Sequence, residues 1–359
     1  MARALRIEYP GAFYHVMARG NRRGSLFPKD EDCVLFLDTL GEACVKSGWR
    51  VHGWVLMGNH YHLLLETPRA NLVEGMKWLQ NTYTRRFNVR HRGWGRLFGD
   101  RYKAVIVQSE EGTYYETLLD YIHLNPVRAG RVRLVSKSEA SVADYPWSSV
   151  AQGYALPAGK RASWLAVLDG LAAFGLSDRP SGRAAFVARL DERARSEKVR
   201  DCGKSLLRER GDGETAEDGR LSDLGRGWYW GTRDFAEVML ERFGSTSRRR
   251  QSRNYRSSGL ERDYASGDAE RVVRTGMEYF GLARAELERL PGAHVGKCAM
   301  GLVITQRTTV SMAWIAERLS MKSAANASQQ IRLFRRKLEG GEIPREVARW
   351  VRNQLRNVA

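Results

Sequence analysis

Apolar and polar positions follow a regular order over the first 125 residues. Four stretches have the composition or alternation typical of strands, namely 12–19 (AFYHVMAR), 50–57 (RVHGWVLM), 60–66 (HYHLLLE) and residues around 102–107. Helical spacing is found within 30–47, from Leu72 to Phe87, and within 112–124. We expect this last helix to end near Pro126, because proline disfavours helical geometry in the residue before it.

The order strand, helix, strand, strand, helix, strand predicts a ferredoxin-like α+β domain over residues 1–150. Such a domain has an antiparallel sheet with helices on one face, and the other face is left open or partly covered by the last helix. Beyond it the chain predicts a helical extension over 151–208 and flexible linkers over 209–268 around a small aromatic-rich helical segment. A helical domain is predicted over 269–359.

The net charge of the chain indicates what kind of molecule it binds. The chain of 359 residues has 59 Lys and Arg against 41 Asp and Glu, a formal net charge of +18. Neutralising phosphates releases condensed counterions, so nucleic acid is the favoured partner. A membrane partner is not expected, because no long apolar segment, signal peptide or basic amphipathic helix is visible, and we expect a cytoplasmic protein. The cysteines (Cys33, Cys44, Cys202 and Cys298) are too scattered to predict a disulfide framework or zinc site.

Two short segments carry the candidate chemistry. His60 and His62 alternate along a predicted strand and should project from one face. Tyr121 and Asn125 lie about one turn apart on a predicted helix. Two imidazoles and an amide oxygen can bind a divalent ion that polarises a phosphate. The attacking group could then be water, as in a simple nuclease, or the Tyr121 phenol, as in an enzyme that forms a covalent intermediate.

Other residues of the same types compete for these roles. His123 is a rival ligand, although its offset of two from Tyr121 places it on another helix face, and Tyr114 and Tyr115 are rival nucleophiles. His15 and His52 are expected to be packing or hydrogen-bonding residues of the sheet. Tryptophans of this region (Trp49, Trp54, Trp78 and Trp94) are expected in the core, although exposed aromatic rings do stack on single-stranded DNA.

The segments around these residues resemble a known family. They are YHVMARGN (14–21), WVLMGNHYH (54–62), FGDRYKA (98–104), DYIHLNPVRAG (120–130) and YPWSS (145–149). Together, over roughly residues 5–150, they look like the single-tyrosine HUH transposases, and more narrowly like the REP-associated tyrosine transposases of the IS200-like branch.

The resemblance implies a site and a reaction. Tyr121 would cut single-stranded DNA, hold its 5′ phosphate covalently and later transfer the strand. His60, His62 and Asn125 would bind Mg²⁺ or Mn²⁺. Hairpin or REP-like DNA would be the substrate, and the protein would act as a monomer or homodimer. A second hypothesis is a catalytically silent DNA-binding regulator derived from a transposase.

Basic and polar residues supply candidate DNA contacts. In the first domain they are Arg19, Asn21, Arg22, Arg23, Arg101, Lys103 and Arg128. Near the carboxyl terminus, residues 308–338 have the pattern of a helix-turn-helix, with a turn over 320–323. Its second helix should present Asn326, Gln329, Gln330, Arg332, Arg335 and Arg336 outward, which predicts contact with duplex DNA.

Overall fold

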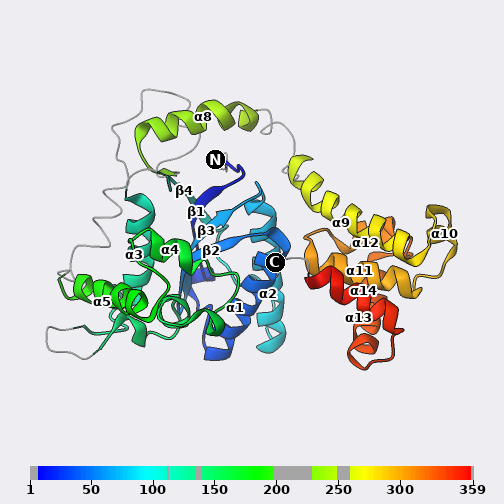
Figure 1. Cartoon of the computed structure of the whole chain (residues 1–359), viewed down its shortest axis with the longest axis horizontal. Coiled ribbons are helices and arrows are strands. Elements are labelled where there is room, and N and C mark those ends of the chain that lie inside the picture. Colours follow the sequence, from blue (N-terminus) through cyan, green and yellow to red (C-terminus); the bar gives the residue numbers. More distant parts are fainter. Residues whose placement is uncertain (1–6, 111–112, 135–139, 197–228, 249–258, 357–359) are drawn as a thin grey trace. The chain divides into compact units, whose positions relative to one another are not determined.

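A computed structural model describes residues 7–110, 113–134, 140–196, 229–248 and 259–356 of the chain. The chain divides into two compact units, and the boundary between their main parts lies after residue 255. The first unit contains the sheet, and the second contains the helices from α9 onward (Figure 1). No helix in the ranges above is long and apolar enough to cross a membrane.

The sheet has the order β2-β3-β1-β4-β5. Its antiparallel strands are β1 (Ala12–Arg19), β2 (Arg50–Met57), β3 (His60–Thr67) and β4 (Lys103–Val107). With helices between β1 and β2 and between β3 and β4, this order confirms the predicted ferredoxin-like α+β fold. The two-residue strand β5 (Tyr229–Trp230) pairs in parallel with β4, so the complete sheet is mixed, which the sequence does not predict.

Two long helices cover one face of the sheet (Figure 1). They are α1 (Asp30–Ser47) and α2 (Leu72–Arg90). The Phe36 ring lies 4.8 Å from that of Tyr61 on β3, and the Tyr83 hydroxyl donates to the Leu26 carbonyl at 2.7 Å. All four of these side chains are buried, so this face forms the apolar core of the unit.

The helix α3 (Tyr114–Arg128) packs against β2 on the other face of the sheet. Gly53 allows this close approach, because a Cβ there would lie 2.5 Å from Cδ1 of Leu119. The helix ends at Arg128, two residues after Pro126, so it ends near the expected position but includes the proline. The Asn125, Pro126 and Val127 carbonyls accept bonds from Ala129, Arg131 and Gly130, so the last turn is stabilised although proline contributes no N–H.

The described residues from 140 to 248 belong to the first unit. Short helical turns occur at Val142–Asp144 (η2), Val150–Tyr154 (η3) and Ala158–Lys160 (η4). They are followed by α4 (Val167–Ala172), α5 (Pro180–Ser196) and later α8 (Arg233–Arg248). Helix α5 packs against α3.

A buried carboxylate joins α5 to α3. Asp120 is 1% exposed and accepts hydrogen bonds from Arg189 at 2.8 and 2.5 Å, and also from Arg193. Charge-assisted, bidentate bonds of this kind fix orientation as well as contributing energy. Because Asp120 precedes Tyr121, this ion pair holds the part of α3 that bears the candidate nucleophile.

Between residues 259 and 356, the second unit contains the helices α9 (Gly259–Phe280), α10 (Arg284–Arg289), α11 (Val295–Arg307), α12 (Met312–Arg318), α13 (Ala324–Glu339) and α14 (Arg345–Arg356). Helix α11 is its central element and packs against α9, α13 and α14. Buried Lys297 donates to the Leu290 and Ser320 carbonyls at 2.9 and 3.0 Å, which anchors the turn before α13.

The structure describes only part of the two predicted linkers. Residues 209–227 lie outside the described residues. In the second predicted stretch, 244–267, α8 continues to Arg248 and α9 begins at Gly259, so helix occupies both ends of that range.

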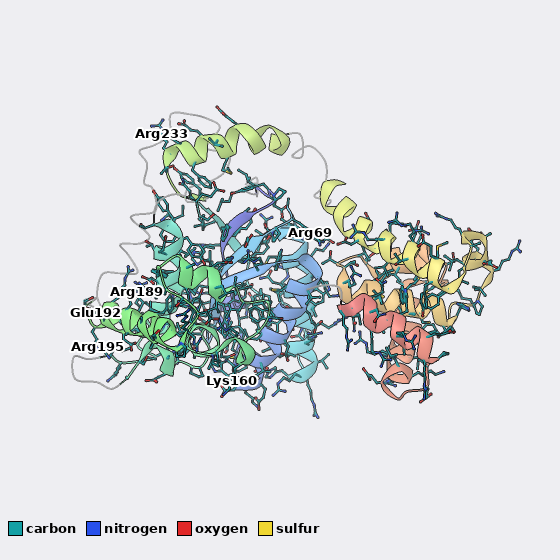
Figure 2. The ribbon with its side chains drawn as sticks, viewed as in Figure 1. Arg69, Lys160, Arg189, Glu192, Arg195 and Arg233 are labelled. Atoms are coloured by element: carbon teal, nitrogen blue, oxygen red, sulfur yellow. The ribbon has the colours of Figure 1, made fainter. Side chains whose placement is uncertain are left out.

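We expect Asp120→Ala to lower the free energy of unfolding of the first unit by about 2–4 kcal/mol, because it leaves two guanidinium groups without their buried carboxylate. Urea unfolding of the full chain measures this. Glu192→Ala is the matched control, since Glu192 is an exposed acidic residue on α5 near Arg189 (Figure 2). Equal effects of the two substitutions would show that the ion pair does not stabilise the docking of α3.

Candidate active site

His60 and His62 lie on the face of the sheet that α3 covers. In the register, His60 is opposite Arg19 and His62 is opposite Met17 on β1. The two imidazole rings are 5.2 Å apart between centroids, as expected for residues that alternate along one strand. His60 is partly exposed and His62 is 6% exposed, so the pair lies at the border between core and solvent.

Helix α3 brings Tyr121 to these imidazoles. Its ring centroid is 5.7 Å from that of His62 and 5.8 Å from that of His15, and both contacts are edge-on. The Arg128 guanidinium lies 5.3 Å from the centre of the same ring, within cation–π distance. Tyr121 is half-buried, and half-buried Asn125 follows it by one helical turn.

A hydrogen bond fixes the proton of His60. Its Nδ1 lies 2.8 Å from Oδ1 of Asn59, which can only accept, so Nδ1–H is the donor and Nε2 carries the lone pair of the ring. Burial, together with the neighbouring Arg19 charge, lowers the pKa of His60 to about 4. His60 is therefore neutral at pH 7, which is the form of imidazole that ligates metals.

His62 is held in a similar way by another histidine. Its Nδ1 lies 2.9 Å from Nε2 of His15, a residue of β1 that is 1% exposed. With the proton on Nδ1 of His62, its Nε2 carries the lone pair through which the ring could ligate a metal. The sequence predicts His15 as a packing or hydrogen-bonding residue of the sheet and gives it no link to the site.

These donors fit a divalent ion. Histidine ligands at metal sites are commonly oriented by a hydrogen bond at Nδ1, and Nδ1 of both His60 and His62 has such a partner. The predicted third ligand is the amide oxygen of Asn125, which lies on α3 one turn after Tyr121. The part of the chain that the structure describes contains no group of three His, Cys, Asp or Glu side chains arranged to hold a metal, so the candidate set depends on this amide.

The rival residues have other partners. His123 is 1% exposed and lies 2.7 Å from Oγ of Ser149, and burial lowers its pKa to about 3. Its ring packs against Tyr154 and Phe186, on the side of α3 that faces the extension.

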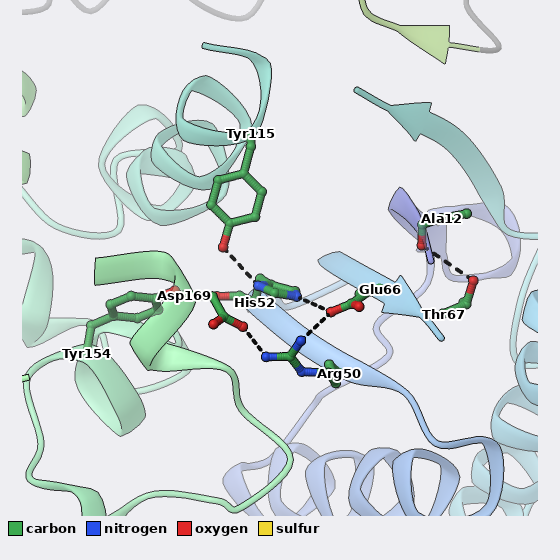
Figure 3. A network of polar contacts seen from close by, with 8 residues as sticks. All are labelled: Ala12, Arg50, His52, Glu66, Thr67, Tyr115, Tyr154 and Asp169. Carbon is green, nitrogen blue, oxygen red and sulfur yellow. Dashed lines mark hydrogen bonds and ion pairs between the residues drawn. The ribbon is translucent and has the colours of Figure 1, made fainter. Parts of the chain in front are cut away.

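Tyr115 belongs to a polar network at the opposite end of the strands (Figure 3). Its hydroxyl is 2.9 Å from Nδ1 of His52, whose Nε2 is 3.1 Å from Glu66. Arg50 contacts both Glu66 and Asp169, which connects β2 and β3 to α4. This network accounts for His52 and Tyr115 as structural residues.

The candidate DNA contacts of the first unit are mostly exposed. Arg19, Asn21, Arg22, Arg23, Arg101 and Lys103 are exposed, whereas Arg128 is half-buried beside Tyr121. Arg22 and Arg23 have positive φ angles of 51° and 62°, which are uncommon for residues with a side chain. Met17 of β1 pairs with His62 on β3 and with Lys103 on β4. Lys103 and His62 are therefore at the same level of the sheet, with one strand between them.

In the second unit, α12, a short turn and α13 occur where the helix-turn-helix is predicted. Gln329, Arg332, Arg335 and Arg336 are exposed on α13, and Gln330 is half-buried. Asn326 is also half-buried, with its amide oxygen close to Gly292, so it is less available than predicted.

Together the fold and the site define a ferredoxin-like domain with a histidine and tyrosine site on one sheet face. Residues 9–125 match the protein family described as "Transposase IS200 like". This range includes His60, His62, Tyr121 and Asn125 and lies within the predicted domain. This region is therefore similar to the IS200-like transposases.

Comparison with solved structures adds a match to a REP-associated tyrosine transposase bound to a REP hairpin. It has 18% sequence identity and a TM-score of 0.35, and it covers 42% of this chain and 82% of the other. No curated protein matches the chain.

We expect His15→Ala to weaken Mn²⁺ binding by about tenfold or more, because His62 loses the partner that orients its ring. His15→Gln should restore part of the affinity, since its amide oxygen can accept from Nδ1 of His62. Calorimetric titration of the full chain with Mn²⁺ measures both. His52→Ala is the control for loss of a buried sheet histidine that does not contact His62. Unchanged affinity in His15→Ala would contradict the positioning role.

Proposed function

We propose that the protein is a divalent-metal-dependent single-strand DNA endonuclease and strand transferase that acts through a covalent link to Tyr121. The observation that carries the proposal is the contact between Tyr121 on α3 and His62 on β3, whose rings lie 5.7 Å apart. The match of residues 9–125 to the IS200-like transposase family supports the same class of reaction. Hairpin DNA of the REP type is the proposed substrate.

The reaction is a phosphoryl transfer to a phenol. The Tyr121 hydroxyl oxygen attacks the scissile phosphorus, the bond between phosphorus and the 3′ oxygen breaks, and a 5′ phosphotyrosine forms. The phenol releases its proton to solvent, and the departing 3′ oxygen takes up one to become a hydroxyl. Attack by a 3′ hydroxyl on the phosphotyrosine reverses these changes, so a strand is joined without an external energy source.

The residues around Tyr121 have complementary tasks. His60, His62 and Asn125 would hold a divalent ion, which when bound supplies Lewis-acid polarisation of the phosphate. Arg128, whose guanidinium lies over the Tyr121 ring, would bind the transferred phosphate. The ion pairs of Asp120 join α3 to α5 of the same chain, and Leu119 of α3 packs over Gly53 of β2. This supports action in cis.

The expected result for the unmodified chain is a covalent protein–DNA adduct with 5′-end phosphate linkage when it is incubated with labelled hairpin DNA and Mn²⁺. Tyr121→Phe should abolish the adduct, because the attacking oxygen is gone. His62→Ala should reduce it by about 100-fold or more, since a missing ligand removes most of the electrostatic stabilisation. Denaturing gels with 5′- and 3′-labelled strands detect the adduct and the released 3′ hydroxyl.

Tyr114→Phe and Tyr115→Phe are the matched controls and should retain the adduct. An adduct that persists in Tyr121→Phe would refute the nucleophile. Cleavage without an adduct would indicate attack by water. Binding of hairpin DNA with neither cleavage nor adduct would favour the silent regulator.

For the second unit we propose binding to the backbone and bases of duplex DNA through α13. Exposed Gln329, Arg332, Arg335 and Arg336 lie on one helix whose buried side, with Ala327, Ile331 and Phe334, belongs to the core of the unit. The N-terminus of α13 is capped by Ser323, whose hydroxyl accepts from the Asn326 N–H at 3.2 Å. Arginine and glutamine are suited to phosphates and base edges.

Replacing Arg332 or Arg335 by alanine should weaken duplex binding and reduce the slope of log affinity against log salt by about 1 for each phosphate that the variant no longer neutralises. Fluorescence anisotropy with duplex DNA at several salt concentrations measures the slope. Arg352→Ala on α14 removes an exposed arginine from another helix and is the control. Equal slopes for all three variants would contradict binding through α13.

A further inference from the structure

An exposed tryptophan stands out on the first unit. Trp94, between α2 and β4, is 93% exposed, whereas the other described tryptophans are buried or half-buried. The sequence predicts it in the core, so this expectation is wrong. A side chain of this size in water forfeits the free energy of burial, and its exposure therefore requires a cause.

The surroundings of Trp94 are polar and basic. It lines an open groove of about 540 Å³ together with Asn81, Arg85, Asn88 and Arg92. Arg85 and Arg92 are exposed, and so is the following Arg96. An exposed ring among guanidinium groups is the combination that single-stranded nucleic acid binds, by base stacking and phosphate contact.

The loop that carries Trp94 is held in place. The Asn88 amide donates to the Gly95 carbonyl at 3.1 Å, and the Gly93 N–H donates to the Asn88 carbonyl at 2.9 Å. Arg92 has a φ angle of 50°, an uncommon conformation that the surrounding bonds maintain. Trp94 therefore stands on a defined turn at the end of α2.

A series of hydrogen bonds connects this loop to the histidine site. The Asn21 N–H donates to the Leu97 carbonyl at 2.8 Å, and the Gly99 N–H donates to the Arg19 carbonyl at 3.1 Å. The next link is from the Gly20 N–H to the Asn59 carbonyl at 2.9 Å, and the Asn59 side chain accepts from His60. The loop and the exposed arginines at 19–23 thus lie at the same end of the sheet as His60.

We propose that Trp94 is a stacking platform for one base of single-stranded DNA, with Arg85 and Arg92 binding the adjoining phosphates. The inference rests on the proposed function, because it takes the DNA that Tyr121 would cut as the ligand. Single-stranded DNA fits better than duplex, since only an unpaired base presents a free face to the indole. Hydrogen bonds of Leu97 and Gly99 to residues 19–21 tie the segment that follows Trp94 to the basic end of β1.

The test is binding of fluorescent single-stranded DNA to the full chain in EDTA, where affinity is measured without cleavage. Trp94→Ala should raise Kd by about 5-fold or more, the usual effect of removing one stacked base. Trp94→Phe should restore most of the affinity and Trp94→Leu should not. Leu168→Ala removes an exposed apolar side chain from α4 and should have no effect.

An abasic scan of the DNA separates stacking from a structural role. At one position, removal of the base should weaken binding to the unmodified chain and leave binding to Trp94→Ala unchanged, because the two changes delete the same interaction. Additive effects at every position would overturn the inference, as would unchanged affinity of Trp94→Ala. A change in oligomeric state by light scattering, with DNA binding intact, would instead identify an interface between copies of the chain and refute the platform.

The two proposals fail in different ways. If the unmodified chain forms the Tyr121 adduct and Trp94→Ala binds DNA equally well, only the stacking platform is refuted. If no adduct forms, yet the abasic scan locates a base on Trp94, the platform survives as a DNA-binding surface and the reaction does not.

Discussion

The candidate site depends on how closely α3 approaches the sheet. Three consecutive residues of α3 make its contacts with three different partners, because successive side chains of a helix point about 100° apart. Leu119 packs over Gly53, Asp120 binds the arginines of α5, and Tyr121 meets His62. A Cβ at residue 53 would collide with Leu119, and removal of the ion pairs would free the helix from α5. The extension after residue 140 therefore supports the geometry of the site, since it fixes the helix that bears the proposed nucleophile.

Burial and partners separate residues that chemistry alone cannot distinguish. His60 retains partial exposure and a lone pair on Nε2, whereas His123 is enclosed by Ser149, Tyr154 and Phe186. The same contrast distinguishes half-buried Tyr121 from Tyr115, whose hydroxyl bonds to His52 and whose pKa burial raises far above its usual range. A phenol that is hard to ionise is a poor nucleophile, so the environment of Tyr115 disfavours it for the proposed reaction.

Local patterns predict most of the fold of the first 125 residues, because its strands and helices have strong periodicity and short connections. Strands at 12–19 and 50–57 and the helix at 30–47 occur with the predicted limits. The pairing of His62 with His15 could not be predicted, since it follows from β1 lying beside β3 rather than from spacing along the chain. Helix α3 continues two residues past Pro126. Backbone hydrogen bonds to the Asn125, Pro126 and Val127 carbonyls stabilise this last turn, which proline alone would disfavour. Strand β5 has two residues, too few for any periodic signal.

The segments at the end of the sheet near His60 contain arginines with positive φ angles and an exposed tryptophan, both of which are uncommon. Hydrogen bonds between these segments maintain the unusual backbone conformations. Positive φ angles at Arg22, Arg23 and Arg92 cost on the order of 1 kcal/mol or more each, and Gly20 is required because a Cβ there would meet the Gly24 carbonyl oxygen. Hydrogen bonds from Asn59 to Arg23 and from Asn21 to Leu97 maintain these turns. These strained arginines and the exposed indole of Trp94 lower the stability of the free protein. They are consistent with a surface whose conformation is set before its ligand arrives, so that less conformational entropy is lost on binding.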